Sequence, residues 1–176
     1  GIALITEDRK GEGLLLTQSI SANIALGNMP GISSGGLVNP GDEAGLAQRQ
    51  IDAMRIRSSG PAQLVSELSG GNQQKVALAK MLSVEPQVVF LDEPTRGVDV
   101  GAKAEIHRQI RDLANEGVGV IVISSELPEV LRLAHRIAVM CEGRITGILP
   151  GGASQEQIMA LATQRNAKND ETGEAA

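Results

Sequence analysis

Residues 87–94 read Gln-Val-Val-Phe-Leu-Asp-Glu-Pro, an uninterrupted apolar run that ends in two carboxylic acids and a proline. The run Gln87–Leu91 is rich in β-branched and aromatic residues and lacks polar alternation, which predicts a central strand buried on both faces. Ligands of parallel sheets bind beyond the carboxyl ends of the strands. Asp92 and Glu93 are therefore expected at the ligand-binding edge of a sheet.

Strands and helices alternate on either side of this run. Buried strands are expected over Ile2–Thr6, Val118–Ile123 and Arg136–Met140, and an edge strand over Ile145–Leu149. Helices are expected over six further segments: Ser19–Leu26, Glu43–Met54, Ser69–Leu82, Ala102–Ala114, Leu127–Ala134 and Gln155–Ala162. The Gly- and Pro-rich segment Asn28–Asp42 predicts a surface loop. This alternation predicts an α/β fold with a parallel sheet covered by helices on both faces.

Composition excludes several classes of protein. The chain has 176 residues, a net charge of −5, one Phe and neither Trp nor Tyr, which argues against nucleic acid as a partner. The single cysteine, Cys141, has no partner within the chain for a disulfide. Because no apolar run reaches the ~18 residues that a membrane helix needs, we expect any membrane role to be peripheral. The chain starts with Gly1 in an apolar segment, so we expect a fragment of a longer protein.

The two acids at the end of the central strand suit nucleotide chemistry. Asp92 would hold Mg²⁺, directly or through water, beside the phosphates of a nucleotide. Glu93 points the other way along the strand and could orient and deprotonate an attacking water. The alternative is that the two acids and Pro94 merely form a polar exit from the strand.

A second candidate site precedes that strand at Leu68-Ser69-Gly70-Gly71-Asn72-Gln73-Gln74-Lys75. Two glycines after a capping serine leave backbone N–H groups uncovered at a helix N-terminus, where the helix dipole favours an anion. This segment is therefore predicted to face a phosphate. The alternative is an ordinary serine cap followed by a glycine-rich turn.

Several segments together resemble one family. Leu68–Lys75 is similar to the signature sequence of ATP-binding cassette (ABC) ATPases, Val88–Glu93 to their Walker B strand and Gly97–Asp99 to their D-loop. The strings Thr6–Lys10, Asn72–Lys75, Arg96–Lys103 and Ser124–Val130 narrow the resemblance further. They resemble the second ATPase half of the duplicated subunit of bacterial monosaccharide importers of the ribose and galactose class.

The resemblance implies a role for each matching residue. In this family two cassettes face each other and sandwich ATP between the Walker motifs of one and the signature of the other. Asp92 would serve Mg²⁺ and Glu93 would be the general base. The remaining nucleotide-binding candidates are Ser69, Gly70, Gly71 and Gln73 of the signature, Asp99 of the D-loop, Glu7 at the Q-loop position and Ser125 at the switch position.

The same resemblance implies cofactors, partners and location. ATP and Mg²⁺ are the expected cofactors. The expected partners are an opposite cassette, a membrane permease and, indirectly, a periplasmic sugar-binding protein, and the expected location is the cytoplasmic face of the bacterial inner membrane. The implied fold is a P-loop NTPase-like cassette that occupies residues 1–162, with a helical subdomain at about 14–84 and a core part at about 85–150. Residues 163–176 are expected to be a disordered tail.

Two departures from the family pattern stand out. No Gly-x-x-x-x-Gly-Lys-Ser/Thr occurs in the sequence, so we expect the Walker A strand and loop to be missing by truncation at the N-terminus. Ser125 stands where the family has a switch histidine, and a serine hydroxyl cannot carry that positive charge to the γ-phosphate. We therefore expect these residues to contribute more to the ATP site of the opposite cassette than to a site of their own.

Two alternatives to an importer ATPase remain open at the sequence level. One is a soluble, non-transport ABC ATPase that acts on DNA or the ribosome, against which the negative charge and low aromatic content argue. The other is a non-catalytic regulatory half-cassette that lends only its signature. The missing phosphate loop and Ser125 favour the regulatory alternative.

Overall fold

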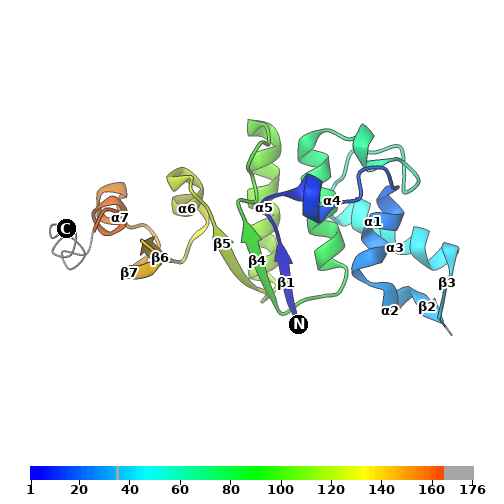
Figure 1. Cartoon of the computed structure of the whole chain (residues 1–176), viewed down its shortest axis with the longest axis horizontal. Helices are drawn as coiled ribbons and strands as arrows, with labels where there is room; N and C mark the ends of the chain where they lie inside the picture. Colours follow the sequence, from blue (N-terminus) through cyan, green and yellow to red (C-terminus); the bar gives the residue numbers. More distant parts are fainter. Residues whose placement is uncertain (35, 165–176) are drawn as a thin grey trace, which may run out of the picture. The chain divides into compact units, whose positions relative to one another are not determined.

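The computed structural model describes residues 1–34 and 36–164, and the chain divides into two compact units (Figure 1). The first unit is Gly1–Ser125, and the second begins at Glu126. Most of the residues expected to form the disordered tail, 165–176, lie outside the described part. The expected division into a helical subdomain and a core part stays a prediction.

The first unit is built on a three-stranded parallel sheet. Its strands are β1 (Ile2–Ile5), β4 (Val88–Asp92) and β5 (Gly119–Ile123), in the order β1-β4-β5. Asp92 is the last residue of the central strand and pairs with Ile123. The sequence therefore located this strand and its acidic end correctly.

Most helices of the first unit lie in the segment between β1 and β4, and one more lies between β4 and β5. They are η1 (Arg9–Gly13), α1 (Ile20–Gly27), α2 (Met29–Ile32), α3 (Pro40–Ala53), η2 (Val65–Glu67), α4 (Gly70–Leu82) and α5 (Val100–Asn115). The short strands β2 (Ser33–Ser34) and β3 (Leu37–Val38) form a small hairpin. Helix α4 contacts β1, α1, α3 and α5, and every residue of Gln73–Ala79 is buried. It is therefore the central helix of this unit.

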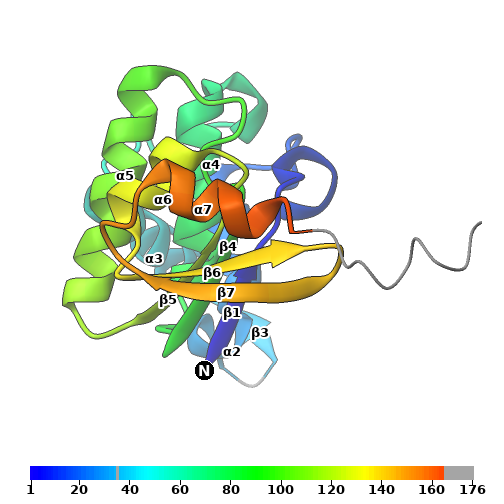
Figure 2. The same ribbon diagram turned by 90° about the vertical axis from the view of Figure 1, so that its left-hand side faces the viewer.

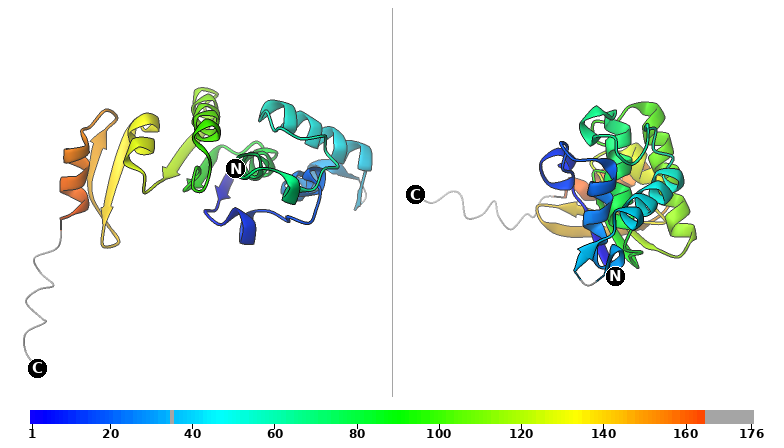
Figure 3. Two further views of the ribbon diagram at one scale, coloured as in Figure 1. Left: turned by 90° about the horizontal axis from the view of Figure 1, so that it is seen from above. Right: turned by 90° about the vertical axis from the view of Figure 1, so that its right-hand side faces the viewer.

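The sheet of the first unit is buried on one face, contrary to the expectation of strands buried on both. The strand order advances in one direction, so right-handed crossovers put α4 and α5 on the same face (Figure 3). Side chains alternate accordingly: Ala3, Ile5, Val89 and Leu91 are buried, whereas Leu4 is 52% exposed. Further exposed apolar side chains on the other face are Ile2 (75%), Ile121 (44%) and Ile123 (50%).

The predicted surface loop over Asn28–Asp42 contains more regular structure than expected. Besides α2 and the β2–β3 hairpin, it includes the start of α3, which begins at Pro40 rather than at Glu43. The Asn39 side chain accepts a hydrogen bond from the Gly41 N–H at 2.9 Å, and a proline is well suited to the first turn of a helix. Local capping thus overrides the Gly- and Pro-rich composition.

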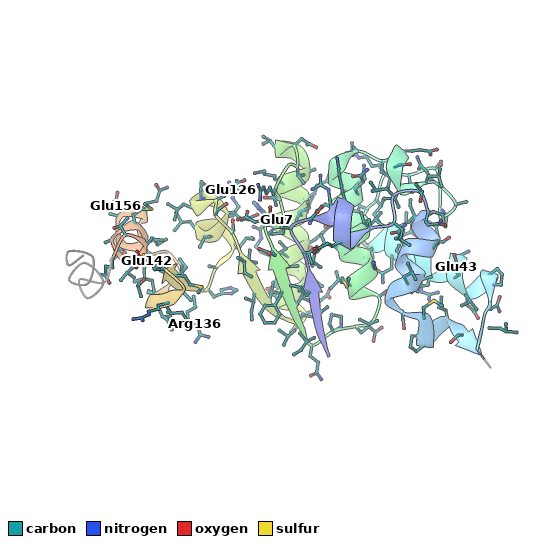
Figure 4. The ribbon with its side chains drawn as sticks, in the orientation of Figure 1. Glu7, Glu43, Glu126, Arg136, Glu142 and Glu156 are labelled. Atoms are coloured by element: carbon teal, nitrogen blue, oxygen red, sulfur yellow. The ribbon has the colours of Figure 1, made fainter. Side chains whose placement is uncertain are left out.

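The second unit contains α6 (Leu127–Leu133), β6 (Arg136–Cys141), β7 (Arg144–Pro150) and α7 (Gln155–Ala162) (Figure 2). Ile137 and Val139 of β6 pack with Ala153 and Ile158. Among the described residues β6 pairs with β7 in an antiparallel sheet, and its expected place in the parallel sheet stays a prediction. Glu142 (φ 48°) and Gly143 (φ 76°) form the tight turn that favours this hairpin. Figure 4 labels Glu142 at that turn.

Candidate nucleotide site

The carboxylate of Glu93 is held by the backbone at the end of the neighbouring strand. Its Oε1 accepts a hydrogen bond from the Ser125 N–H at 2.7 Å, and the Glu93 N–H donates to the Ile123 carbonyl at 2.9 Å. The structure thus brings together Glu93 and Ser125, which are 32 residues apart in the sequence. The Ser125 contact uses the main chain, so any residue except proline at this position could make it.

Glu93 also has an unusual backbone conformation. Its φ of 47° lies in the left-handed region, which residues other than glycine rarely adopt. Such a conformation costs of order 1–3 kcal/mol and occurs preferentially at active sites and ligand clamps. It turns the chain at the end of β4, so that the carboxylate reaches Ser125 beyond the strand ends. Asp92 precedes this turn and is half-buried.

The loop after β1 is tied to the loop after β4. Glu7 forms an ion pair with Arg96, with both side chains largely exposed, and Figure 4 places Glu7 near the carboxyl end of β1. Arg9 donates from Nη1 to the Arg96 carbonyl at 3.0 Å and more weakly to Gln74 Oε1 at 3.5 Å. Exposed ion pairs contribute little stability, so the Arg9 hydrogen bonds are the firmer part of this link. Glu7 is one of the predicted site residues.

The segment Ser69–Gly71 occupies the predicted helix N-terminus. Ser69 is the N-cap residue of α4, but its hydroxyl makes no capping hydrogen bond. Instead Ser69 Oγ accepts a hydrogen bond from the Asn72 side-chain amide at 3.0 Å. The first backbone N–H groups of α4 are thus not covered by the Ser69 side chain, as an anion-facing turn requires.

Gln73 lies differently from the other signature residues. It is 7% exposed, and its Nε2 donates to the carbonyls of Val65 and Leu68, both at 3.2 Å. In this structure the Gln73 side chain therefore holds the loop before α4 and does not share the exposed side of Ser69. Contact between Gln73 and a nucleotide stays a prediction.

A cleft of about 170 Å³ lies beside the N-terminal turns of α4 and α5. Ser69, Gly71 and Asn72 line one side, and Asp99 lines the other. Asp99 caps α5, since its Oδ1 accepts a hydrogen bond from the Ala102 N–H at 3.0 Å. Ser69 and Gly71 of the predicted signature therefore share one cleft with Asp99 of the predicted D-loop.

Three further charged residues, Arg57, Lys75 and Glu105, line this cleft and are not among the predicted site residues. Lys75 of α4 is buried and forms an ion pair with Glu105 of α5. The hydrogen bond from Lys75 is the main reason that the pKa of Glu105 lies below its ordinary value. The sequence offers one signal for the role of Lys75, which is a lysine directly before the apolar run Val76–Ala79. A helix that is buried on all sides has no exposed face for a charge, so such a lysine needs partners inside the protein.

The donor set around Asp92 limits which metal could bind. Within residues 1–34 and 36–164 no group of three or more His, Cys, Asp or Glu side chains could hold a metal ion by itself. Mg²⁺ often keeps several waters and binds through one or two carboxylates together with substrate phosphates. Asp92 fits a Mg²⁺ ion that arrives with a nucleotide.

The described helices include none that is long and apolar enough to span a membrane.

Comparison with known proteins agrees with this geometry. Residues 5–96, just over half of the chain, match the family model described as "ABC transporter". The chain belongs to the ABC transporter family. The matched part of this cassette begins at Ile5, the last residue of β1, and includes the signature turn and the acidic end of β4.

Similar ABC proteins include ribose import ATP-binding proteins. The chain is 56% identical over 165 residues to "Ribose import ATP-binding protein RbsA 2" of Agrobacterium fabrum, covering 93% of this chain and 33% of that protein. It is 49% identical over 164 residues to a "Putative ribose/galactose/methyl galactoside import ATP-binding protein 1" of Rhizobium etli, covering 93% of this chain and 31% of the relative. The cassette thus spans about a third of the length of these curated relatives.

Solved structures support the same fold. An ATP-binding cassette of an ABC transporter, MJ1267, superposes with a TM-score of 0.74 at 21% identity, over 92% of this chain and 68% of that one. The dimeric cassette MJ0796 bound to ADP and Pi gives a TM-score of 0.71 at 18% identity, over 87% of this chain and 64% of that one. The predicted α/β cassette fold is confirmed.

Proposed function

We propose that this chain is part of the ATP-hydrolysing subunit of an ABC importer for a monosaccharide. The names of its relatives support an import ATPase, at about half identity over nearly the whole chain. Because the chain spans only a third of those proteins, the activity belongs to the native polypeptide that contains these residues. In it, the Ser69 side of the cleft completes an ATP site whose phosphate loop belongs to an opposite cassette.

The observation that carries this proposal is the arrangement of acids at the carboxyl end of β4. Glu93 accepts the Ser125 N–H at 2.7 Å from a backbone with φ 47°, and Asp92 lies directly before it. A carboxylate oriented in this way can accept a proton from water that attacks a γ-phosphate. Asp92 would hold Mg²⁺, which neutralises charge on the phosphates when nucleotide is bound.

The second half of the proposed chemistry occurs at the signature turn. Ser69 and the uncovered N–H groups of α4 would donate hydrogen bonds to the γ-phosphate of ATP on the opposite cassette. Asp99, across the same cleft, would link the two ATP sites. We infer that this chain contributes more in this way than through its own site, since Ser125 offers no imidazole to a phosphate.

The proposed partners follow from an import function. A membrane permease would be moved when the two cassettes close on ATP and separate after hydrolysis. We place the cassette at the cytoplasmic face of the inner membrane and expect it to be peripheral, with a sugar-binding protein as an indirect partner. The loop Glu7–Gly13 is exposed apart from Arg9 and Gly13, and is the surface that we assign to permease contact.

The test compares two substitutions in the native polypeptide, purified from its source after its intact mass has been measured. Ser69→Arg is expected to lower the ATPase rate at least about tenfold, because a bulky cation at the signature blocks approach of the opposite nucleotide. Glu93→Gln is expected to have a smaller effect if this chain acts mainly on the opposite site. The exposed residue Ser66 provides the matched control, Ser66→Arg, which should leave the rate unchanged.

The outcomes separate the proposal from its alternatives. An unchanged rate in Ser69→Arg together with an abolished rate in Glu93→Gln would overturn the assignment to the opposite site. Unchanged ATPase rates in both variants would contradict the proposed ATPase function itself. A native polypeptide of 18.4 kDa that hydrolyses no ATP but associates with another cassette would favour the regulatory half-cassette instead.

A further inference from the structure

Lys75 is a charged side chain in the middle of a buried helix. Its side chain is 2% exposed, and the residues on either side of it, from Gln73 to Ala79, are all buried. Burying an ammonium group is costly unless ion pairs and hydrogen bonds replace its contacts with water. The contacts of Lys75 must therefore be kept whenever α4 is packed in place.

Those contacts join α4 to two other segments. Lys75 Nζ donates to the backbone carbonyl of Arg55 at 3.0 Å and forms an ion pair with the carboxylate of Glu105 on α5. Arg55 has a φ of 50°, so the chain turns sharply after α3 at the residue that Lys75 binds. Arg57 lies 3.9 Å from the other carboxylate oxygen of Glu105.

A chain of hydrogen bonds leads from this segment to the signature serine. The Arg57 N–H donates to Asn72 Oδ1 at 3.0 Å, and Asn72 Nδ2 donates to Ser69 Oγ at 3.0 Å. Asn72 is thus fixed between the segment that Lys75 holds and the hydroxyl that we assign to the γ-phosphate. On the other side of the cleft, Glu105 belongs to the helix that Asp99 caps.

We propose that Lys75 is a positioning residue for the ATP site: it sets the place of Ser69 relative to Asp99 by holding α4, α5 and residues 55–57 together. This inference rests on the proposed function, because it assigns Ser69 and Asp99 to nucleotide chemistry. Lys75 does not touch the nucleotide. Its amine is used inside the protein, and its effect reaches the ligand through Asn72 and through α5.

The structural test uses amide hydrogen exchange in this chain with Lys75→Met, which keeps an unbranched apolar side chain and removes the amine. The Arg57 amide is the reporter, because its bond to Asn72 depends on the placement of residues 55–57. We expect exchange at Arg57 to become at least about tenfold faster. The matched control is Lys80→Met on the same helix, since Lys80 Nζ donates to the Gly13 carbonyl at 3.0 Å and lies away from the cleft.

The functional test measures ATPase kinetics of the native polypeptide. Lys75→Met is expected to lower kcat at least about tenfold and to leave KM within about twofold, because ATP is bound mainly by the opposite cassette. Lys80→Met should leave both constants unchanged. Glu105→Gln should lower kcat in the same way, and the double variant Lys75→Met/Glu105→Gln should be no slower than Lys75→Met, because the pair acts as a unit.

Each outcome has one meaning. If Lys75→Met matches Lys80→Met in kcat while Ser69→Arg lowers it, the positioning role is wrong and the proposed function stands. If Ser69→Arg is also without effect, the proposed function fails. If Lys75→Met does not fold, Glu105→Gln replaces it in the kinetic test. The double variant Glu105→Gln/Asn72→Ala is then compared with each single variant. Losses in kcat that add up in the double variant would contradict one connected network.

Discussion

Three charged side chains of the first unit form hydrogen bonds with backbone atoms of segments far away in the sequence. Glu93 accepts the Ser125 N–H, Arg9 donates to the Arg96 carbonyl, and Lys75 donates to the Arg55 carbonyl. Backbone partners do not depend on the identity of the partner side chain. The positions of these three charged groups therefore follow from the path of the chain and tolerate substitutions at residues 55, 96 and 125.

Glu105 makes a pH-dependent contribution to stability. Its pKa is lowered by the hydrogen bond from Lys75, with smaller contributions from the charges of Lys75, Arg57 and Arg108. Because this pKa is lower in the folded state, the charged carboxylate stabilises the fold at pH values above 4.5, its ordinary pKa. That stability is lost as the pH falls through the folded-state pKa. We expect Glu105→Gln to flatten the dependence of the urea unfolding midpoint on pH below 4.5. An unchanged slope would contradict the Lys75–Glu105 pair.

Helices α4 and α5 approach each other closely at their N-terminal turns. A Cβ atom placed on Gly71 would lie 2.6 Å from the Ala102 Cβ, a short side chain that cannot move aside. At Gly70 the nearest atom to such a Cβ is the end of the flexible Arg9 side chain, at 3.1 Å. The two adjacent glycines of the signature thus meet different steric constraints.

We expect Gly71→Ala to destabilise the chain by about 1–3 kcal/mol, as overpacking in a well-packed interior does. Gly70→Ala is the matched control and should lower stability less, because the Arg9 side chain near Gly70 can move aside. Alanine favours the helix over glycine by about 1 kcal/mol, which partly offsets the remaining strain. Urea unfolding of the two variants gives the comparison. Equal losses of stability would show that the contact with Ala102 does not limit the distance between α4 and α5.

The chain also exposes an apolar sheet face in its first unit. Leu4 and Ile121 flank Phe90 on this face and are 52% and 44% exposed. Contiguous exposed apolar surfaces of this kind mark places where other protein surfaces bind. Free strand edges add to this tendency.

We expect this chain, when isolated, to self-associate through the exposed sheet face. Leu4→Lys/Ile121→Glu should weaken association at least about tenfold, because each buried Leu or Ile contributes about 1.5–3 kcal/mol. Sedimentation velocity over a range of concentrations measures the effect. Leu37→Lys is the control, since Leu37 is 78% exposed on the small β2–β3 hairpin. A monomer at all concentrations, or equal effects of both changes, would contradict the prediction.

Local signals in the sequence predicted most elements of this cassette. The apolar run before Asp92, the serine before the signature helix and the helix Gln155–Ala162 all appear where expected. Strand runs, caps and helical periodicity depend on residues close together in the chain, so they can be recognised without a fold. The resemblance to ABC ATPases rests on the same short segments.

Tertiary structure decided which sides of those elements are buried and which residues meet. An apolar run indicates a strand but not whether both faces are covered, and here the order β1-β4-β5 places α4 and α5 on one face. Likewise β6 pairs with β7 because a tight turn at Glu142 and Gly143 brings them together. The bonds of Lys75 to Arg55 and Glu105 and the Glu93–Ser125 bond join residues 20 to 32 positions apart. Short-range patterns cannot report such contacts, because they form only once the chain has folded.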